Sequence, residues 1–139
     1  LINDGYARVT QGYDDRGNQV EWSFFGLDGQ PILDKTGIAR TTRVYDDRGN
    51  RVEGAVFGTD GELVLNKDGI ARVISSYDER GNNIELAYFG IDDLPILNKE
   101  GYARVTDAYD DYGNKVGIAY FDTKNKYIKG TGTLKKPSK

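Results

Sequence analysis

One unit of 32 residues repeats four times without insertion or deletion, and this constrains the fold more than any other feature. The copies begin at equivalent leucines and cover residues 1–128; these leucines are Leu1, Leu33, Leu65 and Leu97. Repetition at a fixed period indicates an array in which each unit packs on its neighbours. We therefore expect four units, 1–32, 33–64, 65–96 and 97–128, followed by an irregular basic C-terminal cap or linker, 129–139.

Each unit contains a turn motif between two segments of strand-forming residues. The motif Tyr-Asp-x-x-Gly-Asn occupies residues 13–18, 45–50, 77–82 and 109–114. In the first copy, residues 6–13 and 19–25 flank it and are rich in β-branched and aromatic side chains. Glycine tolerates the positive φ of a tight turn, and the leading Asp can accept bonds from turn amides. The pattern predicts a β-hairpin, with a shorter third strand at residues 31–33.

The alternation of apolar residues fixes the faces of the predicted hairpin. A four-residue loop, 14–17, places one set on a common face: Ala7, Val9, Tyr13, Val20, Trp22 and Phe24. Arg8 and Glu21 then share the opposite face, where the recurring Phe25 also falls, as diagonal neighbours about 7–8 Å apart at the backbone. The same pairing is predicted for Arg40/Glu53 and Arg72/Glu85, but the last copy has Gly117 instead of an acid.

Electrostatics favour hairpins laid side by side. In a parallel solenoid the four arginines would stack at about 4.8 Å, which is unfavourable for like charges. No 3.6-residue apolar stripe indicates a helix. The predicted fold is therefore all-β: an elongated, twisted, antiparallel array of four β-hairpin repeats.

The residue inventory argues against catalysis and thiol chemistry. The chain has no His and no Cys, so it lacks the commonest general base, the best nucleophile and any disulfide. We predict that it is not an enzyme and needs no cofactor. Asp14, Asp15 and Asn18 offer oxygen ligands for calcium, but they recur as turn residues, so we predict a structural role and no metal site.

Charge is distributed unevenly along the chain. Six of its lysines lie within residues 123–139 with no acid; removing them from the net charge of −3 leaves −9 on residues 1–122. This disfavours nucleic-acid binding by the repeats. The basic tail is interpreted as a solvated linker, with binding to a polyanion as the alternative.

No apolar run reaches the roughly 20 residues that span a bilayer, so we expect no membrane segment. The chain begins at Leu1, in phase with the repeat, and is interpreted as part of a longer protein. Its compartment is not determined by the sequence, and a cell-surface or secreted location is favoured over the cytoplasm.

The recurring Tyr-Asp-x-x-Gly-Asn motif resembles the YD, or RHS-type, repeats of large bacterial surface and toxin-carrying proteins. That resemblance implies strips of β-hairpins that wind into long sheets or shells. The period of 32 residues departs from the roughly twenty residues of those repeats, and four units are too few to enclose a shell.

A second resemblance involves residues 57–64 and 88–92, which look like the aromatic-x-x-Asp-Gly core of choline- and glucan-binding cell-wall repeats. Those families hold ligands between tryptophans, whereas this chain has only Trp22. The resemblance implies a polysaccharide-binding module as an alternative function.

Two regular series are the candidate binding residues. The arginines form a possible charged stripe, although neighbouring glutamates favour structural pairing; they are Arg8, Arg40, Arg72 and Arg104. The tyrosines form a possible stacking ladder for sugar rings, although the predicted faces direct them toward the core; they are Tyr13, Tyr45, Tyr77 and Tyr109.

The leading functional hypothesis is a non-catalytic repeat module of a larger bacterial protein, acting as scaffold, spacer or protein-binding surface. The alternative is a lectin-like module that binds cell walls or polysaccharides. An open array also ends in unpaired strands, so self-association through the repeat edges is a further hypothesis.

Overall fold

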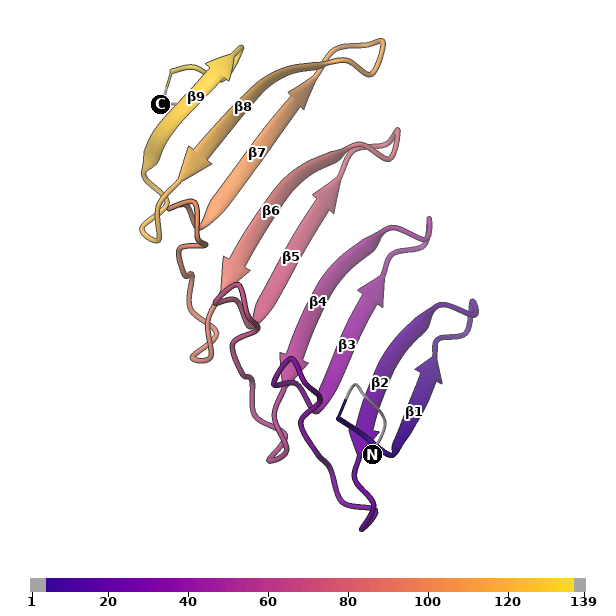
Figure 1. The fold of residues 1–139 in the computed structure, drawn as a ribbon. Helices are drawn as coiled ribbons and strands as arrows, with labels where there is room; N and C mark the ends of the chain where they lie inside the picture. The colour runs from indigo at the N-terminus through magenta and orange to yellow at the C-terminus, as the bar shows by residue number, and fades with distance from the viewer. Residues whose placement is uncertain (1–4, 137–139) are drawn as a thin grey trace.

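Within residues 5–136 the chain folds into one open sheet of nine antiparallel strands, ordered in space as they are in sequence (Figure 1). The computed structural model describes residues 5–136. The strands are β1 (Arg8–Tyr13), β2 (Gln19–Phe25), β3 (Arg40–Tyr45), β4 (Arg51–Phe57), β5 (Arg72–Tyr77), β6 (Asn83–Phe89), β7 (Arg104–Tyr109), β8 (Lys115–Phe121) and β9 (Tyr127–Gly132). Each repeat supplies one hairpin, which confirms the predicted all-β hairpin array.

The turn motif forms each hairpin as its chemistry suggests. The Asp14 N–H donates to the Asn18 carbonyl at 2.9 Å, and the Gly17 N–H donates to the Asp14 carbonyl at 3.1 Å. Gly17 has a φ of 85°, a conformation that glycine adopts without a steric penalty. The Asp14 carboxylate accepts the backbone N–H groups of Arg16 and Asn18 at 3.0 and 2.9 Å. Aspartates occupy the same place in the other copies, at Asp46, Asp78 and Asp110.

The predicted four-residue loop is wrong in length but right in the faces that it implies. Tyr13 pairs with Gln19, whereas Gly12 pairs with Glu21, so residues 14–18 form the loop and Val20 is skipped. This bulge compensates for the extra loop residue, because one extra residue in a strand restores the alternation of faces. Val9 opposes Phe24, and the predicted apolar face survives.

Most of the apolar core lies on one face of the sheet, where the long loops fold back over it. The Ile32 N–H donates to the Phe24 carbonyl at 3.1 Å and draws the loop along β2. In the last two units the Tyr102 ring lies between Tyr88 and Tyr120, with centroid distances of 5.9 and 4.6 Å. Among residues 5–136 the buried apolar side chains are Phe24, Ala39, Ala55, Ile70, Ala71, Ala103, Val105 and Ala119. Of these, Ala55 and Ala119 lie on the other face, where they pair with Thr42 and Thr106.

Two predicted segments differ from the structure. The short strand expected at residues 31–33 is reduced to isolated bridges, such as the one between Phe25 and Pro31. The irregular tail expected from residue 129 begins later, because β9 continues to Gly132 and pairs with β8. The repeated leucines at 33, 65 and 97 remain 44–46% exposed, and Leu1 lies outside the described residues.

Figure 1 shows that the short hairpin turns follow one side of the sheet and the long loops the other. Neighbouring hairpins pair over a short stretch: Glu21 with Thr42, Trp22 with Thr41, and Ser23 with Arg40. Side chains must therefore supply much of the contact between successive units.

Candidate interaction surfaces

The repeated arginines lie on the face opposite most of the core, and three of the four stack on phenylalanine rings. Arg8 opposes Phe25 across the hairpin, and its guanidinium carbon is 4.7 Å from the ring centroid. Arg40 lies over Phe57 at 4.5 Å and Arg104 over Phe121 at 3.9 Å. Cation–π stacking explains why a phenylalanine recurs on the more polar face.

The glutamates pair with arginines of the following unit, so the predicted pairs within hairpins are wrong. Arg40 pairs with Glu21 at 3.6 Å, Arg104 pairs with Glu85 at 3.3 Å, and Arg72 pairs with Glu53. Within the first hairpin Glu21 opposes Gly12, four residues from Arg8, which is beyond side-chain reach. Pairing between β2 and β3 instead sets Ser23 opposite Arg40, two residues from Glu21.

Most arginines of the candidate stripe already bind a glutamate of the preceding unit. The Arg72 and Arg104 side chains are each 24% exposed and make a second bond through Nε, to Asp93 at 2.9 Å and to Asn125 at 2.8 Å. Arg8 is exposed and, within residues 5–136, has no carboxylate partner. The stripe is therefore a series of links between units, and in the part of the chain that the structure describes only Arg8, on β1, has no acidic partner.

A second link joins neighbouring units at the hairpin turns. Arg16 donates through Nη1 to the Asp47 carbonyl and pairs with the Asp47 carboxylate at 3.2 Å. Arg48 and Arg80 donate in the same way to the carbonyls of Glu79 and Asp111. The sequence analysis did not predict this link. The signal for it was the arginine that recurs at the same position of the turn, as Arg16, Arg48 and Arg80.

The candidate tyrosines sit beside the hairpin turns and do not form a stacked ladder. Tyr13 lies on the predicted face, where its hydroxyl donates to Gln11 Oε1 at 2.9 Å, but it is 58% exposed and not covered by the core, whereas Tyr45, Tyr77 and Tyr109 are half-buried. The Tyr77 hydroxyl donates to the Arg51 carbonyl of the preceding unit at 2.9 Å. The aromatic chain of the core instead uses Tyr88, Tyr102 and Tyr120.

The turn aspartates are occupied by hydrogen bonds of their own turns. The Asn18 side chain, and then the backbone N–H groups of Asn18 and Arg16, lower the pKa of Asp14 against a smaller opposing effect of desolvation. The pKa of Asp46 is lowered mainly by the backbone N–H of Asn50, and that of Asp110 by the backbone N–H of Asn114. Among residues 5–136 no three acidic side chains are placed to hold a metal ion.

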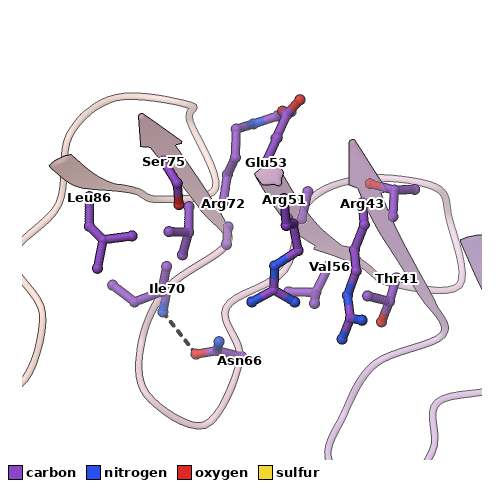
Figure 2. Close-up of a pocket in the computed structure, with 15 residues that line it drawn as sticks. Thr41, Arg43, Arg51, Glu53, Val56, Asn66, Ile70, Arg72, Ser75 and Leu86 are labelled. Carbon is purple, nitrogen blue, oxygen red and sulfur yellow. Dashed lines mark hydrogen bonds and ion pairs between the residues drawn. The ribbon is translucent and has the colours of Figure 1, made fainter. Parts of the chain in front are cut away.

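One hollow lies beside a position at which the second unit differs from the others. Gly54 stands where the other copies carry Trp22, Leu86 and Ile118, and it lines a space of about 220 Å³. Figure 2 shows Arg43 and Arg51 directed to the same side of the sheet, opposite the side that carries Arg72 and Glu53. Arg43 also lies over the Trp22 ring, with 4.5 Å between its guanidinium carbon and the centroid.

The hollow is open and cationic at its border. Arg43 and Arg51 have no carboxylate partner among the described residues, and Leu86 and Ile70 contribute apolar walls. A volume of 220 Å³ lies below the roughly 300–1,000 Å³ typical of small-molecule pockets. The space therefore suits one small anionic group and not an extended ligand.

Comparison with known proteins adds no family assignment. No protein-family model matches the chain, and no curated protein matches it either. In the part of the chain that the structure describes, no helix is long and apolar enough to cross a membrane.

Proposed function

We propose that this chain is a non-catalytic repeat module of a larger bacterial protein, acting as a scaffold, spacer or protein-binding surface. The observation that carries the proposal is the use of the repeated charged residues. Arg16, Arg40 and Glu21, with their equivalents, bond to neighbouring units. Residues that form such links hold neighbouring units together in one continuous array.

The geometry supports a spacer because each further unit extends the sheet in the same direction, across its strands. Each hairpin contributes two strands to a single sheet, so one unit adds about twice the strand spacing, roughly 9.6 Å, along the array. Such a module separates its two ends by a distance set by the number of units.

Small-angle X-ray scattering tests the spacer role. The measurement compares the native chain with a chain that has one more copy of residues 33–64 inserted between residues 64 and 65. We expect the longest dimension to grow by about 9.6 Å, the contribution of two more strands. An unchanged dimension, or a flexible profile for the native chain, contradicts the spacer.

The hollow at Gly54 favours a second candidate, binding of an acidic polysaccharide through a single carboxylate group that enters the hollow while the rest of the polymer stays outside it. Arg43 and Arg51 supply charge at the border of the hollow, and the Trp22 ring lies beneath Arg43. A glycan array that contains uronic-acid polymers tests it, with Gly54→Leu as the variant that fills the hollow. Selective binding that this variant abolishes favours the candidate, whereas an array without signal rejects it.

A further inference from the structure

The boundary between two units has two chemically different sides. The forward side of a unit carries an arginine in the hairpin turn and a glutamate in the second strand, such as Arg48 and Glu53. The backward side of the next unit receives them with a turn carbonyl and a strand arginine, such as Glu79 and Arg72. The array therefore has a direction, from forward side to backward side.

The last unit lacks the two charged residues that form the forward side of the other units. Tyr112 stands at the position of the turn arginine and is 90% exposed, and Gly117 stands at the position of the glutamate. The segment after β9 closes this end, because the Thr133 N–H donates to the Val116 carbonyl at 3.0 Å. A Cβ added at Gly117 would lie 2.7 Å from Thr133 Oγ1, so the glycine is needed for this closure.

The first unit keeps its backward side complete, although no unit of the described chain occupies it. Arg8 matches Arg40 in position and stacking, and Asp15 matches Asp47, whose carbonyl receives Arg16. Ala7 matches Ala39, whose carbonyl accepts the Phe24 N–H at 2.8 Å. The outer edge of β1 pairs with no other strand among residues 5–136.

From this asymmetry we propose that β1 is the receiving edge of the array. It pairs with the second strand of one further unit of this same repeat, placed in register on the N-terminal side, whose glutamate meets Arg8 and whose turn arginine meets the Asp15 carbonyl. The inference rests on the proposed function as a continuous repeat module and gives it a direction of growth.

Charge selects this occupant over a second copy of the chain. The opposite end presents Lys124, Lys126 and Lys129, all exposed, which repel Arg8. Two β1 edges bring together strands that each carry Arg8 and no acid. A second strand of the repeat, in contrast, offers a glutamate two residues from the position that opposes the arginine.

The test is a five-unit chain in which a copy of residues 65–96 precedes residue 1. Hydrogen exchange reports the β1 amides that point away from β2, and urea unfolding reports stability. A matched control uses the same added copy with Arg80→Tyr and Glu85→Gly, the residues found at these positions in the last unit. A third chain carries the unchanged copy after residue 139.

We expect the unit added at the N-terminus to slow exchange of these β1 amides about tenfold and to raise the urea midpoint. The control copy gives smaller changes, and the copy at the C-terminus gives none. Unchanged β1 exchange, equal gains at both ends, or a dimer of the native chain with protected β1 amides overturns the proposal. The scattering test of the spacer uses an internal insertion, so its outcome is independent of this one.

Discussion

Two glycines of the second unit show how position decides the effect of the same substitution. Gly49 has a φ of 83° in its hairpin turn, whereas Gly54 lies in β4 without a positive φ. A Cβ at Gly54 meets only the Thr42 carbonyl oxygen, at 4.0 Å. We expect Gly49→Ala to lower the free energy of unfolding by about 1–2 kcal/mol, and Gly54→Ala to raise it by about 0.5–1 kcal/mol. Urea unfolding of both variants measures this, and shifts of the same sign contradict it.

The turn aspartates predict how stability depends on pH. Their pKa values in the folded chain lie below the usual 3.8 because the carboxylates accept turn hydrogen bonds, as at Asp14, Asp46 and Asp110. For Asp78 desolvation opposes this shift, but the bonds from Asn82 and Arg80 outweigh it and lower the pKa. The unfolded chain therefore takes up protons first as the pH falls. The stabilisation is present above the unfolded pKa and is lost as the pH falls toward the folded values.

Urea midpoints measured from pH 7 to pH 2 test this expectation. Changing the four turn aspartates to Asn flattens the decrease at acid pH, because Asn keeps an acceptor for the turn amides but does not titrate there. The matched control changes Asp15 and Asp111 to Asn, since their side chains make none of these turn bonds. A control that flattens the profile equally contradicts the assignment.

At the scale of the hairpin, sequence reasoning found the strands, the turn and the faces, but not the partners of the charged residues. The faces depend only on whether the total number of residues in the loop and the bulge is odd or even. Val9 and Phe24 therefore share a face even though the predicted loop length is wrong. The partner of Glu21 depends on the register between hairpins. That register is set by β2–β3 pairing and the long loop, and no local turn motif encodes it.

The two alternative partners of one arginine give a direct test of register. Arg72 pairs with Glu53 in the structure, whereas the sequence pattern paired it with Glu85. We expect the double-mutant cycle Arg72→Met with Glu53→Gln to give a coupling energy of about 0.5–1 kcal/mol, because both side chains are about three-quarters covered. The cycle of Arg72→Met with Glu85→Gln serves as the control and should give no coupling. Coupling confined to Glu85 contradicts the observed register.

At the scale of the whole molecule, the period predicted a linear array but not the way in which its C-terminal end is closed. Residues after 128 depart from the repeat, so no pattern predicted that β9 extends the sheet. The signals at this end were Tyr112 at the position of the turn arginine and Gly117 at the position of the glutamate. The hollow at Gly54 was missed because the sequence shows the loss of a side chain but not whether neighbouring side chains fill the space beside it.

The closing strand carries the last prediction. Without β9, the outer edge of β8 exposes backbone groups beside Ile118 and Tyr120, which is the condition under which sheet edges associate. A chain that ends at Lys126 should unfold at lower urea than the full chain and self-associate as its concentration rises, whereas a chain that lacks only residues 137–139 should do neither. Urea unfolding and light scattering at several concentrations measure both effects. A truncated chain that stays monomeric with an unchanged urea midpoint contradicts this role of β9. That outcome would mean that apolar contacts with the third unit, such as Tyr102 against Tyr88, are enough to hold the last unit in place.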